Sequence, residues 1–169
     1  ISIGNGIGTG ASYAISKRIG AGESDSASKA ASQSLMMTIA AGAASLILLV
    51  VTVVPLMDYM GAGDILALCT DYAYPVILSA PLLMMGGVLS GCLRGEGAAK
   101  RSTAILVTAA IFNMVLDPVF IYWFDMGIAG AAYATVVSSA ISMIPAVYWY
   151  AVRKDVLVPI SFIGFRFTR

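Results

Sequence analysis

Four long apolar windows constrain this chain more than any other feature. Each is close to the roughly 20 residues that a helix needs to cross the hydrocarbon core of a bilayer. They cover residues 35–57, 65–93, 102–124 and 128–152. Of all residues 59% are hydrophobic and only 11% are charged, too few to wet the surface of a soluble domain. No segment alternates with the period of two that a membrane strand needs. The sequence therefore predicts an all-α polytopic membrane protein.

Residues 1–16 are also apolar and lack the charged leader and cleavage site of a signal peptide. We interpret them as a fifth, truncated span, the tail of a longer helix, and expect the chain to be a fragment. Within the second window, Asp71, Pro75 and Pro81 interrupt the apolar run. The membrane part of that window is therefore expected to begin near Tyr72.

The basic residues gather on alternate loops between the windows. All ten Lys and Arg residues fall in segments 16–29, 93–101 and 153–169. The only charged residues in segments 58–64 and 125–127 are aspartates. Lys and Arg retained in the cytoplasm set the orientation of membrane helices. The first three segments are therefore predicted to be cytoplasmic, in a multi-pass protein of the plasma membrane.

A carboxylate and an amide lie inside the third window. Asp117 is about 22 Å from the predicted cytoplasmic start of its helix, within the outer half of a core about 30 Å thick. A charged Asp near the bilayer centre costs about 2.5–3.5 kcal/mol on insertion scales. Asn113 lies one turn below it on the same face. Pro118 leaves a carbonyl near Met114 without its helical partner.

The fourth window carries hydroxyl groups at the same depth. Thr135 is about 10 Å from the outer end of its helix, and Asp117 is about 8 Å from the outer end of the preceding one. Ser138, Ser139 and Ser142 continue the stripe below Thr135 at helical spacing. Two antiparallel helices with polar faces at one depth predict a shared, partly hydrated cavity.

Structural explanations of these features stay open. One alternative is that Asp117 and Pro118 cap a helix that ends early, with residues 118–124 as an interfacial segment. A Ser/Thr stripe also serves to pack helices together. The segment GNGIGTG (4–10) matches no nucleotide-binding loop, and close helix packing explains it better.

The sequence contains no residue pattern typical of an enzyme active site. Histidine is absent, and no Ser/His/Asp set or Cys/His cluster is present, so we predict neither an enzyme nor a metal or cofactor site. The net charge of +1 and the lack of a basic, aromatic-interleaved patch argue against nucleic acid as a partner. Cys69 and Cys92 would lie about 35 Å apart along a helix, beyond disulfide reach. We therefore expect two buried structural thiols.

Three stretches of the chain carry a family resemblance. They are GIGTGASYAISKRIGAGESDSASKAA (6–31), LSGCLRGEGAAKRSTAIL (89–106) and NMVLDPVFIYWFDMGIAGAAYATVVSSAIS (113–142). They resemble the multidrug and toxic compound extrusion family, the MATE transporters, and most closely the prokaryotic branch that includes the DNA-damage-inducible efflux proteins. The pattern N-x-x-x-D-P followed by G-I-A-G-A-A-x-A-T is its most specific part.

The resemblance implies a place for the chain in a larger fold. Family members have twelve helices in two six-helix lobes. Residues 1–152 would be part of the N-terminal lobe, from the end of helix 2 through helix 6, and residues 153–169 the start of the cytoplasmic linker between the lobes. Helices 1 and 7 to 12 would be missing.

The resemblance also implies a function. Family members export amphipathic, usually cationic compounds across the bilayer in exchange for H⁺ or Na⁺, by alternating access and without a cofactor. Asp117, Asn113 and Thr135 match the coupling site of similar prokaryotic members, which would hold a proton or Na⁺. Tyr72 is a further candidate for that network, and we expect Pro118 and Pro145 to act as hinges.

Two other functions are open. A lipid-linked oligosaccharide flippase of the same superfamily shares the helix pattern, but it should carry Lys or Arg inside its spans, and none falls there. A truncated membrane fragment without transport activity is the other alternative.

Overall fold

The computed structural model describes residues 2–150, which form helices joined by short turns. The helices are α1 (Ser2–Gly20), α2 (Ser24–Tyr59), the 3₁₀ helix η1 (Gly63–Ile65), α3 (Leu66–Leu78), α4 (Ala80–Gly95), α5 (Ala99–Pro118), the π-helix η2 (Val119–Trp123) and α6 (Gly127–Tyr148). No strand occurs among the described residues, and the predicted all-α class is confirmed. The predicted linker over 153–169 lies outside the described residues.

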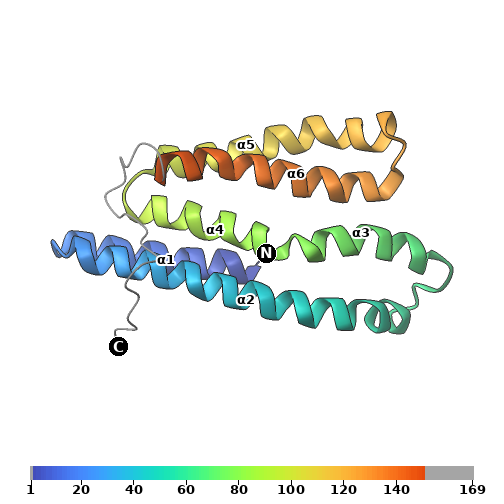
Figure 1. Ribbon diagram of the computed structural model, residues 1–169, viewed down its shortest axis with the longest axis horizontal. Helices are drawn as coiled ribbons and strands as arrows, with labels where there is room; N and C mark the ends of the chain where they lie inside the picture. The colour runs from blue at the N-terminus through green and yellow to red at the C-terminus, as the bar shows by residue number, and fades with distance from the viewer. Residues whose placement is uncertain (1, 151–169) are drawn as a thin grey trace.

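The helices run up and down in three layers (Figure 1). α5 and α6 form one layer, α3 and α4 the middle layer, and α1 and α2 the third. The central element is α4, which contacts α1, α2, α5 and α6. α3 continues into α4 in one direction, and the other consecutive helices are antiparallel. The α1–α2 turn, the α4–α5 turn and the end of α6 therefore lie at one end of the bundle. The α2–α3 and α5–α6 turns lie at the other end.

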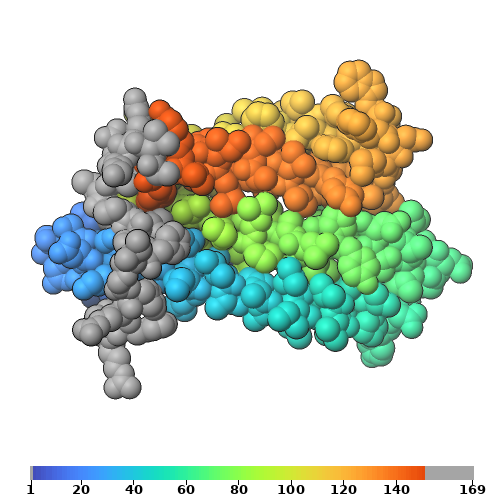
Figure 2. Space-filling view, viewed as in Figure 1, coloured from blue at the N-terminus to red at the C-terminus, as the bar shows by residue number. Residues whose placement is uncertain are grey.

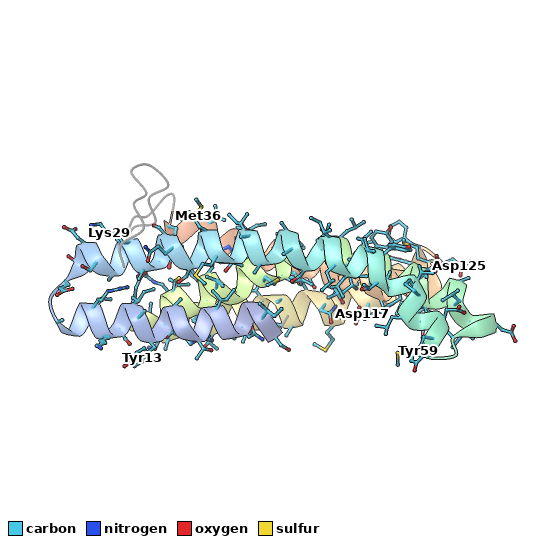
Figure 3. The ribbon with its side chains drawn as sticks, turned by 90° about the horizontal axis from the view of Figure 1, so that it is seen from below. Tyr13, Lys29, Met36, Tyr59, Asp117 and Asp125 are labelled. Atoms are coloured by element: carbon cyan, nitrogen blue, oxygen red, sulfur yellow. The ribbon has the colours of Figure 1, made fainter. Side chains whose placement is uncertain are left out.

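The two ends of the bundle differ in charge. The described Lys and Arg residues all belong to the helix ends and turns of the first end, which we call the basic end: Lys17, Arg18, Lys29, Arg94, Lys100 and Arg101. The opposite end, the acidic end, carries Asp58, Asp64 and Asp125. Figure 3 shows Lys29 in one half of the bundle and Asp117 in the other half, together with Asp125 and Tyr59.

Several of these helices are suited to a bilayer. Among the described residues, three helices are long and apolar enough to cross it: Ser24–Tyr59, Ala99–Trp123 and Gly127–Tyr148. The bent pair α3 and α4 supplies a fourth span if it is counted as one, which agrees with the second apolar window. These elements match the four predicted windows and fit a multi-pass membrane protein.

The predicted truncated span over residues 1–16 stays a prediction. α1 is helical there and packs against α2 and α4, but it is not among the helices apolar enough to cross a membrane. Polar residues such as Asn5 and the terminal Lys17 and Arg18, together with several glycines, lower its hydropathy. α1 is held by close contacts with its neighbours rather than by a strongly apolar surface.

The junction of α3 and α4 bends the second window by 48°. Pro81 stands in the first turn of α4 and has no backbone N–H, so the carbonyl of Ile77 lacks its usual helical donor. The Ser79 hydroxyl donates to the Val76 carbonyl at 2.9 Å and partly closes the broken ladder. The second window is therefore one span bent at a short break between α3 and α4, and membrane spans tolerate proline at such a bend.

Glycines bring α1 and α4 into backbone contact. A Cβ at Gly8 would lie 2.6 Å from the Gly87 carbonyl oxygen, and a Cβ at Gly91 would collide with the backbone of Gly8. Close helix packing is thus the role of the GNGIGTG segment, as predicted. Gly87, Gly91 and Gly130 are also tightly packed, whereas a Cβ at Gly86 would meet no atom within 4 Å.

The outer surface of the bundle, one face of which is drawn in Figure 2, is rich in exposed apolar side chains by residue. Val51 is 68% exposed and Ile47 is 64% exposed, both in the middle of α2. The buried core is formed instead by smaller and branched side chains, among them Ile15, Val88 and Leu93. Large apolar groups outside and small groups inside indicate a surface made for lipid rather than for water.

Candidate functional site

The helix that carries Asp117 continues beyond it. α5 runs through Pro118 and passes directly into η2. In this segment the Phe124 N–H donates to the Val119 carbonyl five residues back, at 3.1 Å. Pro118, which has no N–H, directly precedes this change from α to π geometry. The alternative that Asp117 and Pro118 end the helix early is therefore wrong.

Three of the predicted site residues meet between α5 and α6. The amide nitrogen Nδ2 of Asn113 donates to Oδ1 of Asp117 at 3.3 Å and to Oγ1 of Thr135 at 3.3 Å. The Thr135 hydroxyl in turn donates to the Ala131 carbonyl at 3.0 Å. All three side chains are half-buried. Asn113 is thus the bridge between the carboxylate of one helix and the hydroxyl of the next.

The depth of this cluster agrees with the prediction. Asp117 is about 9 Å before Trp123 and Thr135 is about 12 Å beyond Gly127, counted along their helices. Both therefore lie in the acidic half of the bundle, where Figure 3 places Asp117. Two polar helix faces therefore meet at Asn113, Asp117 and Thr135, whereas the shared, partly hydrated cavity stays a prediction.

The electrostatic surroundings of Asp117 lack a positive partner. The described Lys and Arg residues lie near the basic end, and Arg101, in the same helix, is about 24 Å away. One carboxylate oxygen accepts from Asn113, and no hydrogen bond from a described residue reaches the other. Asp117 therefore has no cationic partner among the described residues.

A glycine sets how closely α6 approaches this cluster. A Cβ at Gly130 would lie 2.8 Å from the backbone of Phe120 in η2. Since Phe120 follows Asp117 by three residues, the close approach at Gly130 holds the two helices together just beside the cluster. Phe120 also stacks on Phe124, with ring centroids 5.6 Å apart.

The serine stripe of α6 behaves differently from Thr135. Ser138 and Ser139 donate to the Thr135 carbonyl at 3.0 and 2.7 Å, and Ser142 donates to the Ser139 carbonyl at 2.7 Å. These hydroxyl groups are therefore satisfied within their own helix, and Ser138 and Ser142 are buried. Below Thr135 the stripe serves helix packing.

Tyr72 does not join the cluster. It is 42% exposed on α3 and makes no hydrogen bond to a described residue. It lines a groove with Met57, Leu68, Cys69 and Ile128. Cys69 is half-buried and Cys92 is fully buried, and both are free thiols, so only Cys92 is buried as predicted.

The two proposed hinge prolines each precede a π-helical turn. Pro118 leads into η2, and Pro145 lies inside α6, which changes to π geometry at residues 149–150. Local π turns after proline are places where the backbone ladder is weaker than in a regular helix.

A contact at the basic end was not predicted. The Tyr150 hydroxyl donates to Oε1 of Glu96 at 3.2 Å, and the guanidinium of Arg101 lies 5.9 Å from the ring centroid of Trp149. Burial, followed by the proximity of Cys92 and of Glu96, raises the pKa of Tyr150 above its ordinary value, so the phenol remains a donor. These contacts join the end of α6 to the α4–α5 turn. The aromatic YWY cluster, visible in the sequence, was the only signal for them.

Comparison with known proteins decides the family. A family model described as MatE matches residues 1–119 of the chain, which is more than two thirds of its length. The chain belongs to the MATE family. MATE proteins are membrane transporters rather than enzymes, they act on small molecules in a bilayer, and they need no cofactor.

Curated MATE relatives are multidrug export proteins. The chain is 30% identical over 162 residues to the multidrug export protein MepA of Staphylococcus aureus, and the match covers 93% of this chain and 35% of that protein. It is 23% identical over 158 residues to MepA of Staphylococcus saprophyticus. The chain thus spans about a third of the length of these relatives.

Solved MATE structures have the same fold. A MATE crystal structure in the bent conformation matches 98% of this chain with a TM-score of 0.94 and 35% identity, and the match covers 37% of that chain. An outward-facing MATE transporter of the MOP superfamily matches 100% of this chain with a TM-score of 0.95 and 35% identity, over 38% of its own length. The bundle therefore has the fold of one part of these longer transporter chains. Among the described residues, no group of three His, Cys, Asp or Glu side chains could hold a metal ion.

Proposed function

We propose that this chain is part of the N-terminal lobe of a multidrug exporter that exchanges H⁺ or Na⁺ for amphipathic, cationic compounds. The observation that carries the proposal is the pair of hydrogen bonds that Asn113 donates, one to Asp117 on its own helix and one to Thr135 on the next helix. Membership of the MATE family and similarity to the multidrug export protein MepA support it.

In this proposal α1 is the end of helix 2, α2 is helix 3, and α3 with α4 is helix 4. α5 with η2 is helix 5, and α6 is helix 6. Residues 1–152 then belong to the lobe and residues 153–169 begin the linker to the second lobe. The basic end faces the cytoplasm of a cell whose plasma membrane holds the protein, because Lys and Arg are retained on that side.

The coupling step follows from the charge of Asp117. A proton or Na⁺ that enters from the acidic end neutralises the carboxylate and ends its attraction for a cationic substrate. Carboxylate, amide and hydroxyl groups also supply the oxygen ligands that hard cations prefer, so Asp117, Asn113 and Thr135 are the proposed ion site. Each charge moved down the membrane potential contributes about 2.3 kcal/mol per 100 mV.

Neutralisation also weakens the bond from Asn113 to Asp117, since a hydrogen bond to a charged acceptor is stronger than one to a neutral acceptor. The helices then rebend at Pro118 or Pro145, where π turns already interrupt the regular ladder. Tyr72, on α3, is proposed to join the site only after such a movement. Alternation between the present helix shape and the rebent one exposes the site to each side of the membrane in turn.

The experiment uses the full-length protein in everted vesicles. A proton gradient and then a sodium gradient are imposed, and a fluorescent cationic dye is followed for the wild type, Asp117→Asn and Asp125→Asn. We expect one gradient to drive dye movement, Asp117→Asn to abolish it, and Asp125→Asn, an exposed carboxylate at the same end, to leave it near the wild-type rate.

Equal dye movement in Asp117→Asn and the wild type would make Asp117 a packing residue and overturn the proposed site. If neither the proton gradient nor the sodium gradient drives dye movement in the wild type, the exporter function itself is overturned. In that case the same vesicles would be tested for translocation of a lipid-linked oligosaccharide, and failure there too would leave a membrane fragment without transport.

A further inference from the structure

Aromatic side chains hold the end of α6 at the basic end of the bundle. The Tyr150 ring, two residues beyond α6, is half-buried and packs against two hydrophobic clusters at once. One cluster joins α1, α2 and α4 around Ile15 and Cys92, and the other joins α4, α5 and α6 around Leu93 and Ile105. Tyr150 therefore lies where these two parts of the core meet.

Polar contacts hold the same end of α6 on a second side. The Tyr150 hydroxyl donates to Oε1 of Glu96, the residue that follows α4, at 3.2 Å. The Arg101 guanidinium lies 5.9 Å from the ring centroid of Trp149, within the range of a cation–π interaction. A tyrosine that is held both by its apolar ring and by its hydroxyl group is fixed in position and in orientation.

The surface that receives these side chains is itself well fixed. The hydroxyl groups of Ser90 in α4 and Ser102 in α5 share a hydrogen bond of 2.7 Å, and each residue is 1% exposed. The Ala98 N–H donates to the Leu93 carbonyl at 2.9 Å in the turn between the two helices. A buried and satisfied polar pair makes one arrangement of its two helices specific. The end of α6 is thus attached to a rigid support.

Pro145 separates this attached end from the rest of α6. Proline has no N–H, so the Ile141 carbonyl lacks its usual helical donor, and the backbone has π geometry at residues 149–150. Helices bend most readily at such interruptions of the ladder. The longer part of α6, which carries Gly130 and Thr135, lies on the other side of the proline.

This longer part of α6 contacts η2, which follows Pro118. A Cβ at Gly130 would lie 2.8 Å from the backbone of Phe120 in η2, so the two segments touch there. Asn113, by contrast, precedes Pro118 in α5. The hydrogen bond from Asn113 to Thr135 therefore joins the fixed side of the two prolines to the side that contacts η2.

The attached end decides which part of α6 moves when the helix bends. Thr135 precedes Pro145 by ten residues, about 15 Å along the helix. A change of about 20° in the bend at Pro145 displaces Thr135 by about 5 Å if the end of α6 stays fixed. The same change leaves Thr135 in place if the end of α6 swings instead. A displacement of about 5 Å is enough to break a hydrogen bond.

We infer that Tyr150 and Trp149 anchor the end of α6, and that the part of α6 before Pro145 moves against this anchor together with η2. The movement opens and closes the contact between Asn113 and Thr135, so Tyr150 is a positioning residue for the candidate site. The inference rests on the proposed function in one respect, because the coupling ion of that function causes the movement.

The test measures distances between pairs of spin labels in the full-length protein by double electron–electron resonance. One pair, Lys29→Cys with Val147→Cys, joins α2 to the anchored end of α6. The other pair, Val51→Cys with Ile128→Cys, joins α2 to the start of α6. All four positions are exposed. The labels are introduced into a Cys69→Ala background, in which the remaining native thiol is fully buried.

The distances are recorded at neutral pH, at low pH and with added Na⁺. We expect protons or Na⁺ to shift the Val51–Ile128 distance by about 5–10 Å, because Ile128 lies farther from Pro145 than Thr135 does. The Lys29–Val147 distance should shift by less than about 2 Å, because that end is close to the hinge and anchored. A constant Val51–Ile128 distance would overturn the inference, and so would equal shifts of both distances.

Tyr150→Ala should release the anchored end, so that the Lys29–Val147 distance also shifts with the ion. Tyr148→Ala is the matched control, because Tyr148 is 47% exposed and its hydroxyl bonds to no described residue. Tyr150→Phe keeps the ring and removes the bond to Glu96, and it should widen the distribution of the Lys29–Val147 distance even if Tyr150→Ala does not fold. Wild-type distances in the Tyr150 variants, or an equal effect of Tyr148→Ala, would show that Tyr150 is no anchor.

Dye export in everted vesicles separates this inference from the proposed function. If the Val51–Ile128 distance shifts as expected but neither gradient drives dye export in the wild type, the proposed function is wrong and the anchor stands. If a gradient drives export while the Val51–Ile128 distance stays constant, the exporter function stands and the inference is wrong.

Discussion

At the scale of single residues, Asn113 is the decisive group of the cluster. One amide nitrogen serves two acceptors, Oδ1 of Asp117 and Oγ1 of Thr135, each at 3.3 Å. Thr135 can accept because its own hydrogen is donated to the Ala131 carbonyl. The orientation of the carboxylate thus depends on a neighbour that has no charge of its own.

Asn113→Ala should therefore impair gradient-driven dye export more than Thr135→Ala does. The alanine removes both bonds, at about 0.5–1.5 kcal/mol each, whereas Thr135→Ala removes one of them. The initial export rate in everted vesicles measures the difference. Ser139→Ala is the control, because its hydroxyl bonds only to its own helix. A larger loss in Ser139→Ala than in Asn113→Ala would contradict this assignment.

At the scale of helices, the contact between α1 and α4 holds one side of the bundle together. The backbones of Gly8 and Gly91 touch, and neither position leaves room for a Cβ. α1 is not apolar enough to count as a membrane span by composition, so this contact matters for its position. Van der Waals contact between small residues is a main source of helix association in a bilayer.

Gly91→Ala should lower the stability of the full-length protein by about 1–3 kcal/mol, the usual effect of overpacking. Gly86→Ala provides a matched comparison in the same helix, because its new methyl group would meet no atom within 4 Å. Alanine also favours a helix over glycine by about 1 kcal/mol, so Gly86→Ala should be neutral or slightly stabilising. Thermal unfolding in detergent, followed by circular dichroism, compares the two. Equal unfolding midpoints for the two variants would show that α1 and α4 can move apart to make room for the methyl group at no cost in stability, which would contradict the prediction.

At the scale of the whole molecule, the separation of charge between the two ends governs orientation. Lys and Arg residues mark one end and aspartates mark the other, and the Asp117 cluster lies in the acidic half (Figure 3). An ion that binds Asp117 therefore has the shorter path from the acidic end. Under the proposed function, the orientation of the chain would fix the side of the membrane from which a coupling ion is taken up.

Cysteine labelling in intact cells tests that orientation. Asp64→Cys and Ser24→Cys are introduced separately into a Cys69→Ala background, with the fully buried Cys92 retained. Both positions are exposed, one at each end. A membrane-impermeant maleimide should label Asp64→Cys in intact cells and Ser24→Cys only after permeabilisation. The reverse pattern would place the basic end outside the cell.

The sequence by itself determined the properties that depend on position along a helix. The spans, the charge of the loops and the common depth of Asp117 and Thr135 follow from hydropathy and from a rise of about 1.5 Å per residue. The chemistry of the candidate site could be predicted in the same way, because Asn113 and Asp117 are one turn apart. These are local quantities, and the order of residues fixes them.

The tertiary structure alone decided how the helices are turned towards one another. It showed that Asn113 serves both partners, that Tyr72 lies outside the cluster, and that the helix continues past Pro118 as a π turn. It also brought Asp71 of α3 beside Tyr133 of α6 in one groove. The rotation of each helix about its axis depends on packing with neighbours distant in the sequence, and that packing is a property of the assembled bundle.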